Sequence, residues 1–196
     1  MTYIDDQHYV DLVVKGDTTA FAVLVNRYKD IVFTLALKMV KDREEAEEAS
    51  QDTFIKVYKS LAKFKGESKF STWLYKIAYN TCLDRLKKNN RDQFVVAIDE
   101  YTVEQIESLN NTLDNIEEKE RKQMIQDCLL LLPGEDSFLL ALYYFEEQSV
   151  KEISKIIGIT ANHVKIRLYR SRKKLTAILR EHLEPEISYY YENGHR

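Results

Sequence analysis

The sequence predicts an all-α protein of two small helical domains joined by an acidic flexible linker, the C-terminal domain containing a helix-turn-helix. Helix breakers are rare, with five Gly and two Pro among 196 residues, while Glu, Lys, Leu and Ala are frequent, and this composition favours helix over sheet. Apolar residues recur at helical spacing in both halves of the chain. Charge is also strongly segregated, which separates the two predicted domains from the segment between them.

The first predicted domain comprises residues 4–91. An apolar stripe at helical spacing occupies residues 21–35 and predicts its first long helix. Asp42 followed by Glu45 resembles a capping box and predicts the start of a second helix. A third helix is expected to begin at one of two capping residues, Ser71 or Thr72.

The second predicted domain comprises residues 119–184. Ser149 and Glu152 have the spacing of a capping box and predict a short helix. Gly158 suits a left-handed turn position after that helix, and Thr160 is expected to cap a longer one. A short apolar helix, a glycine turn and a capped basic helix together form the pattern of a helix-turn-helix.

The net charge of −3 hides two basic blocks. Residues 63–91 carry eight bases and two acids, and residues 149–181 carry nine bases and two acids. Residues 92–120 between them carry nine acids and one base. Residues 92–118 are therefore interpreted as an acidic linker that holds two phosphate-binding surfaces apart, and the polar residues 185–196 as a disordered tail.

In the helix-turn-helix, the second helix would lie in the major groove. Because Val164 and Leu168 are expected to point inward, the outward positions follow from helical spacing. Arg and Asn can pair with base edges, whereas Lys and Tyr mostly reach phosphates. These outward residues are Asn162, His163, Lys165, Ile166, Tyr169 and Arg170.

In the first domain, bases alternate with aromatic residues along residues 63–91, a composition that suits the unstacked bases of a single strand. Trp73 lies on the inward stripe, so core packing is the stronger interpretation for it, with base stacking as the alternative.

Four segments, spread in the right order over about 150 residues, resemble the sigma-70 family of RNA polymerase sigma factors. Residues 42–58 resemble the polymerase-binding helix, residues 64–80 the promoter-melting segment, residues 82–88 the −10 reading helix and residues 152–175 the −35 reader. The chain is most similar to the small extracytoplasmic-function subgroup, which keeps only these two domains. Ile166 departs from the small polar residue that is commoner at its position.

The resemblance implies three sets of binding residues. For polymerase they are Asp42, Glu44, Glu45, Glu48, Gln51, Asp52, Phe54 and Ile55. For the −10 DNA they are Lys69, Phe70, Ser71, Trp73, Lys76, Tyr79, Asn80, Arg85 and Lys88. For the −35 DNA they are Thr160, Asn162, His163, Lys165, Ile166, Arg167, Tyr169, Arg170 and Lys173. It also implies core RNA polymerase (clamp and flap), promoter DNA and an anti-sigma factor as partners, and a bacterial cytoplasm, with nucleoid association when active.

Enzyme signatures are absent from the sequence. It has no glycine-rich phosphate loop and no nucleophile elbow, and its His and Cys residues lack metal-ligand spacing. We therefore expect no catalytic residue, no cofactor, no metal and no small-molecule substrate. Cys82 and Cys128 are interpreted as core-filling residues. The longest apolar run, residues 138–145, is too short to insert into a membrane, where a helix needs about 20 residues.

Two rival hypotheses remain from the sequence. A helix-turn-helix regulator would bind duplex DNA as a dimer without polymerase, and it would leave residues 64–80 without a role. A helical adaptor would bind polymerase and never touch DNA, so charge reversal at Lys76 and Arg85 would leave its function intact.

Overall fold

The computed structural model describes residues 5–88 and 118–193, with side chains as far as residue 182. Regular structure in these ranges is entirely helical, which confirms the all-α prediction. The N-terminal helices are α1 (Asp6–Val14), α2 (Thr19–Val40), α3 (Arg43–Ser60), the 3-10 turn η1 (Leu61–Lys63) and α4 (Phe70–Lys88). The C-terminal helices are α6 (Glu118–Leu131), α7 (Gly134–Tyr144), α8 (Val150–Ile157) and α9 (Ala161–Asn193).

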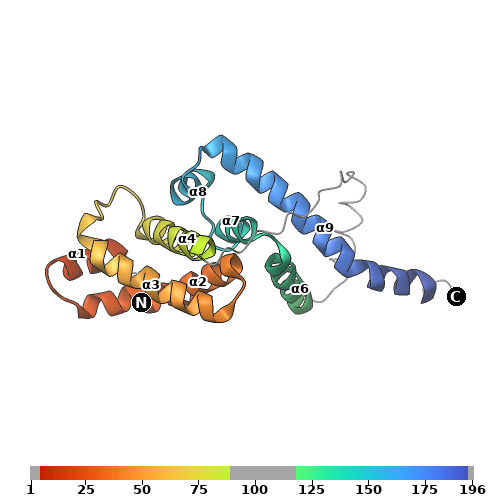
Figure 1. Ribbon diagram of the computed structural model, residues 1–196, viewed down its shortest axis with the longest axis horizontal. Helices are drawn as coiled ribbons and strands as arrows, with labels where there is room; N and C mark the ends of the chain where they lie inside the picture. The colour runs from red at the N-terminus through yellow and green to blue at the C-terminus, as the bar shows by residue number, and fades with distance from the viewer. Residues whose placement is uncertain (1–4, 89–117, 194–196) are drawn as a thin grey trace.

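In the N-terminal unit, α2, α3 and α4 pack against one another and α1 lies along α2 (Figure 1). Asp42 caps α3 by accepting a hydrogen bond from the Glu45 amide at 3.0 Å, as the sequence predicts. The predicted start of α4 was wrong by two to three residues, because Ser71 or Thr72 was expected to cap the helix, whereas it begins at Phe70 and includes both. Their hydroxyl groups favour a cap, but burial of Phe70 brings that residue into the helix.

The C-terminal unit contains the predicted helix-turn-helix, formed by α8 and α9. The capping box is present in full, with the Ser149 hydroxyl and the Glu152 carboxylate each bonded to the other's backbone amide. Gly158 ends α8 with φ +75°, in the left-handed region that favours glycine. Thr160 then accepts a hydrogen bond from the His163 amide at 3.3 Å, at the start of α9.

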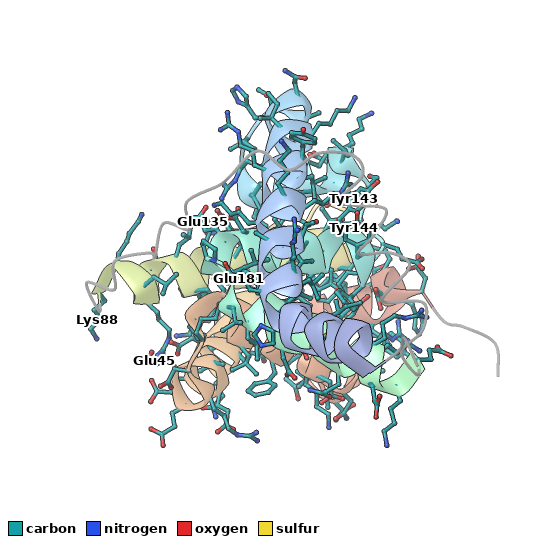
Figure 2. All side chains as sticks on the ribbon, turned by 90° about the vertical axis from the view of Figure 1, so that its right-hand side faces the viewer. Glu45, Lys88, Glu135, Tyr143, Tyr144 and Glu181 are labelled. Atoms are coloured by element: carbon teal, nitrogen blue, oxygen red, sulfur yellow. The ribbon has the colours of Figure 1, made fainter. Side chains whose placement is uncertain are left out.

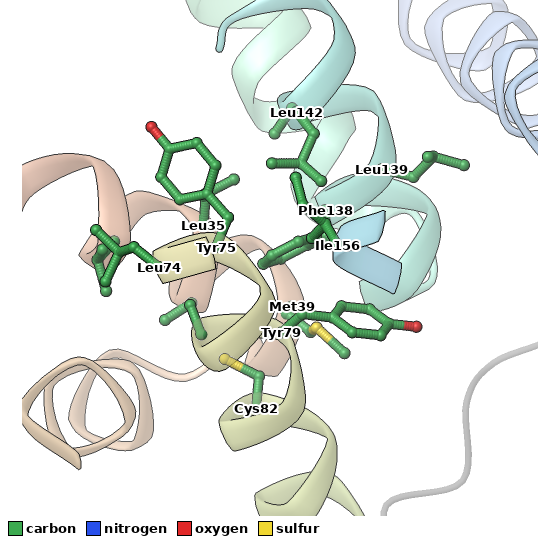
Figure 3. Close-up of a cluster of buried hydrophobic side chains, with 14 of the residues drawn as sticks. Leu35, Met39, Leu74, Tyr75, Tyr79, Cys82, Phe138, Leu139, Leu142 and Ile156 are labelled. Atoms are coloured by element: carbon green, nitrogen blue, oxygen red, sulfur yellow. The ribbon is translucent and has the colours of Figure 1, made fainter. Parts of the chain in front are cut away.

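The two units pack against each other through α2 with α7 and α4 with α8. Figure 3 shows Leu35 and Tyr75 of the N-terminal unit in one apolar cluster with Phe138 and Ile156 of the C-terminal unit. The sequence predicts units that a linker holds apart, so this direct contact differs from the expectation. Burial of apolar side chains from both units, at about 25 cal/mol per Å² of surface removed from water, accounts for it. Of the predicted linker, only Glu118 lies among the described residues.

The C-terminal end also differs from the prediction of a disordered tail at residues 185–196. Helix α9 continues through Pro185 to Asn193. A proline inside a helix costs about 3 kcal/mol, but an established helix extends more easily than a new one nucleates. Residues 194–196 of the predicted tail lie outside the described residues.

Candidate nucleic-acid interface

One face of α4 presents a basic and aromatic stripe to solvent. Lys69, directly before the helix, is followed at helical spacing by Trp73, Lys76 and Asn80. The two lysines and the asparagine are exposed, while Trp73 is half-buried, with its ring centroid 5.2 Å from that of Phe64. The stripe therefore combines cations with one aromatic edge, the composition that binds single-stranded nucleic acid.

Other members of the predicted −10 set lie on different faces of α4. Phe70 is buried, and its ring packs 5.6 Å from Tyr28 and 5.9 Å from Phe64, so it stabilises the core in this structure. Ser71 is half-buried and Lys88 is exposed at the end of the helix. Thus the predicted set does not form a single surface.

The edge of α4 that carries Tyr75 and Tyr79 faces the C-terminal unit. The Tyr79 hydroxyl donates to a Glu135 carboxylate oxygen at 3.1 Å, and the Tyr75 hydroxyl donates to Glu146 at 2.9 Å. Burial and the neighbouring Glu135 carboxylate raise the pKa of Tyr79 to about 12. Burial and the neighbouring Glu146 carboxylate raise the pKa of Tyr75 by more. Both hydroxyls therefore stay protonated and act as donors at neutral pH.

A third acid reaches α4 at its N-terminal end. Glu152 lies 2.9 Å from the Lys69 amine. Burial raises the pKa of Glu152, but Lys69 and the Ser149 hydrogen bonds outweigh it and lower that pKa to about 2. The Glu152 carboxylate is therefore charged over the physiological range, and it both caps α8 and pairs with α4.

On the opposite side, Arg85 of α4 points toward α3. Its guanidinium lies 2.6 Å from Asp52, 2.8 Å from Glu48 and 3.0 Å from Glu45. The hydrogen bond to Asp52 contributes most to raising the pKa of Arg85. Figure 2 shows Glu45 and Lys88 on the same side of the molecule. Arg85 therefore lies among predicted polymerase-binding residues, away from the exposed stripe of α4.

The predicted polymerase-binding residues lie in and before α3. Glu44, Glu48, Gln51 and Ile55 are exposed, and Ile55 has a relative exposure of 51%. The partly covered members are Asp42, Glu45, Asp52 and Phe54. Helix α3 thus presents a mainly acidic outer surface that also carries an exposed apolar side chain.

The outer face of α9 is largely open. Its exposed residues are Asn162, His163, Lys165, Ile166, Tyr169 and Arg170, together with Thr160 at its N-cap. Val164 and Leu168 are buried, so the inward positions are as the sequence predicts. Lys173 is half-buried, its amine 5.1 Å from the centroid of the Tyr169 ring. This exposed face is polar and basic, a composition typical of helices that bind the major groove.

Arg167 differs from the rest of the α9 set because it points inward. It donates to the same Glu135 oxygen that accepts from Tyr79, at 2.8 Å. Deeper in the unit, Asp136 accepts from Ser171 at 2.8 Å and from Lys174 at 2.6 Å. The start of α7 therefore holds α9 and α4 through two adjacent carboxylates.

Sequence reasoning missed Glu135, Glu146, Glu152 and Tyr75 as members of this interface. Glu152 was identified as a capping residue and as part of the −35 reader, and Tyr75 only as one of the aromatic residues of the promoter-melting segment. Their pairing joins residues up to 83 positions apart, Lys69 and Glu152, and no local pattern reports such pairing. The only available signal was the acidic first turn of α7 beside the Pro133–Gly134 break.

Neither a metal centre nor a membrane span is found among the described residues. No three His, Cys, Asp or Glu side chains in that part of the chain are grouped to hold a metal ion. No described helix combines the length and apolarity needed to cross a bilayer.

Comparison with known families gives two matches that correspond to the two helical units. Residues 24–92 match the model of Sigma-70 region 2, and residues 122–175 match that of Sigma-70, region 4. The chain is 35% identical over 175 residues to the ECF RNA polymerase sigma factor SigW of Bacillus subtilis, covering 86% of this chain and 94% of the relative. It is 33% identical over 195 residues to the RNA polymerase sigma-H factor of Pseudomonas aeruginosa, covering 92% and 99%.

Solved structures share the fold. CnrH in complex with the cytosolic domain of CnrY aligns with a TM-score of 0.56 at 20% identity, over 89% of this chain and 96% of that one. The sigma factor RpoE bound to the anti-sigma factor NepR, from Bartonella quintana, aligns with a TM-score of 0.60 at 18% identity, over 82% and 96%.

Proposed function

This chain belongs to the extracytoplasmic-function (ECF) group of the sigma-70 family of RNA polymerase sigma factors, and we propose how its two helical units divide the work of initiation. The N-terminal unit, residues 4–91, binds core polymerase and the −10 element. The C-terminal unit, residues 119–184, binds the −35 element. Residues 92–118 connect them.

The observation that carries the proposal is the pairing of two unlike surfaces on adjacent helices. Helix α3 presents acids and the exposed Ile55, which suit a basic surface of the polymerase clamp. Helix α4 presents Lys69, Trp73, Lys76 and Asn80, which suit an unpaired strand. One rigid unit thereby binds polymerase on one face and the melted strand on another.

The −35 element is assigned to α9 because most of the predicted contact residues are exposed there. All four candidate contacts are exposed, and we assign Arg170 and Asn162 to base edges and Lys165 and Tyr169 to phosphates. Ile166, 40% exposed, is suited to contact a thymine methyl group. The C-terminal unit would also meet the polymerase flap.

The proposed role requires this chain to make or break no covalent bond. Capture of an extruded base returns part of the few kcal/mol spent on unstacking it, and the polymerase supplies the remaining surface. We assign no enzymatic activity. We place the protein in the cytoplasm and on the nucleoid, where core polymerase and promoters are found. An anti-sigma factor is proposed as a regulator, because the similar RpoE was solved with one.

Run-off transcription tests the proposal. Core polymerase alone and core with this chain are compared on a library of promoter fragments. We expect discrete start sites that need the chain, with two common sequence elements upstream of them. Transcripts equal to the background of core alone would contradict the proposal. Binding of duplex DNA as a dimer without polymerase would favour the helix-turn-helix regulator instead.

A further inference from the structure

We propose that the edge of α4 formed by Tyr75 and Tyr79, together with Lys69 directly before the helix, is a nucleic-acid surface that the chain's own C-terminal unit occupies in the absence of DNA. The occupants are three carboxylates, Glu152, Glu146 and Glu135, which stand in for phosphates. The proposal rests on the function assigned above. It adds that the C-terminal unit competes with DNA for the same side chains of the N-terminal unit.

The three acids meet three donors along one edge of α4. Glu152 pairs with Lys69 at 2.9 Å, Glu146 accepts from Tyr75 at 2.9 Å and Glu135 accepts from Tyr79 at 3.1 Å. The acids come from α7, α8 and the loop between them, so they are presented by one continuous part of the C-terminal unit. With that part in place, the side chains of Tyr75 and Tyr79 are 2% and 6% exposed.

The chemistry of these contacts is shared with phosphate binding. Carboxylate and phosphate oxygens are both anionic acceptors, and lysine amines and tyrosine hydroxyls donate to either. A bound acid also cancels the positive potential that attracts a nucleic-acid backbone. The C-terminal unit and a DNA strand therefore compete for the same donors.

Glu135 links this competition to the second DNA surface. A single carboxylate oxygen accepts from Tyr79 of α4 and from Arg167 of α9. Separation of the units would uncover Tyr79, while Arg167 would stay paired with Glu135, because both of those residues belong to the C-terminal unit. Opening therefore uncovers the edge of α4, whereas the outer face of α9 is already exposed in the closed arrangement.

Close contact at Gly134 shows how tightly the closed arrangement is fitted. A methyl group on Gly134 would lie 2.1 Å from the backbone carbonyl oxygen of Met39 at the end of α2. Backbone atoms cannot move aside as a flexible side chain can, so any larger residue would push the units apart. Within its own unit, Gly134 starts α7, where alanine is favoured over glycine.

Zero-length cross-linking of full-length protein reads out the closed state directly. A carbodiimide joins amines and carboxylates in contact, so digestion and mass spectrometry should find a Lys69–Glu152 cross-link. Adding a random-sequence single-stranded DNA of about 30 nucleotides should reduce its yield about fivefold, because DNA and Glu152 compete for Lys69. An unchanged yield at saturating DNA would overturn the proposal.

Two variants test competition without touching a DNA-binding side chain. Gly134→Ala should lower the cross-link yield about tenfold and bind the same DNA about fivefold tighter, because closure no longer opposes binding. Glu135→Gln should act in the same direction, and Glu120→Gln, at an exposed acid of α6, is its charge-matched control. Loss of the cross-link in Gly134→Ala with wild-type DNA affinity would overturn the proposal.

The two proposals fail in different assays. A chain that directs run-off transcription but shows no DNA competition for Lys69 overturns the internal competitor alone. A chain that shows competition but gives no polymerase-dependent transcripts overturns the proposed function and leaves the internal occupancy of α4 in place. Circular dichroism of Gly134→Ala confirms that its helices are retained.

Discussion

The guanidinium of Arg85 lies 2.6 Å from the Asp52 carboxylate and joins the C-terminal part of α4 to the acidic face of α3. The same group also pairs with Glu45 and Glu48. The sequence assigns Arg85 to DNA and its three partners to polymerase. In the structure Arg85 pairs with all three acids, and we propose that it acts on polymerase binding through them.

We therefore expect Arg85→Gln to weaken core polymerase binding more than it weakens single-stranded DNA binding. Each exposed ion pair contributes about 0.2–1 kcal/mol, so the Kd for core should rise about three- to tenfold. Lys88→Gln, at an exposed position three residues further along α4, is the matched control and should affect DNA binding first. Fluorescence anisotropy measures both affinities. If Arg85→Gln weakened DNA binding more than polymerase binding, Arg85 would be a DNA-binding residue instead.

The stability of the closed fold should rise with pH above neutrality because of Lys41. Burial and, to a smaller extent, nearby Lys38 lower the pKa of its amine to about 7, with Asp136 opposing the shift. The amine donates to the Leu129 carbonyl at 3.0 Å, at the junction of the two units. Since the unfolded chain retains the ordinary value of 10.5, it binds more protons than the native chain above pH 7.

The expected result is a gain of about 1–2 kcal/mol in the free energy of unfolding between pH 7 and pH 9. Urea titrations at fixed ionic strength measure it. Lys41→Met should reduce the slope, and the remainder should come from Lys38, whose pKa burial also lowers. Identical slopes for the wild type and Lys41→Met would show that Lys41 titrates normally.

Both cysteines should be nearly inert in the native protein. Burial raises the pKa of Cys82 to about 12 and that of Cys128 to about 11, so both are thiols at pH 8. Their modification by a chromogenic disulfide should be about 100-fold slower than that of glutathione and should reach the glutathione rate in urea. Rapid reaction of either thiol under native conditions would mean that its helix does not pack as described.

Glycine is required at the turn of the helix-turn-helix. Gly158 has φ +75° and its surroundings leave room for a methyl group, so the cost of Gly158→Ala is conformational alone. Urea unfolding should show a loss of about 1–2 kcal/mol. Lys155→Ala, at an exposed position of the same helix, should change stability by less than about 0.5 kcal/mol. Equal effects of the two substitutions would rule out a left-handed turn.

Local sequence patterns predicted the local structure well. The Ser149–Glu152 capping box, the Gly158 turn and the buried Val164 and Leu168 all depend on residues a few positions apart. Such features are determined by backbone hydrogen bonding and helical spacing, so residue types at short, fixed spacing in the sequence predict them.

Contacts between distant residues could not be predicted in the same way. The charge of Arg85 indicates an anionic partner but does not distinguish a phosphate from Asp52, because a guanidinium donates hydrogen bonds to both phosphates and carboxylates. Likewise, Tyr79 and Glu135 are 56 residues apart, and their meeting depends on how two folded units fit together. Nothing local to either residue encodes that fit.

The central claim is that the two units are closed on each other in the free chain and open on the promoter. Pulsed electron–electron double resonance between spin labels attached through Lys59→Cys in α3 and Lys155→Cys in α8 measures it, since both positions are exposed, neither belongs to a predicted binding set, and the native thiols are buried. We expect one short distance for the free protein and a longer one after core polymerase and promoter DNA are added. A distance distribution unchanged by polymerase and promoter would contradict the account.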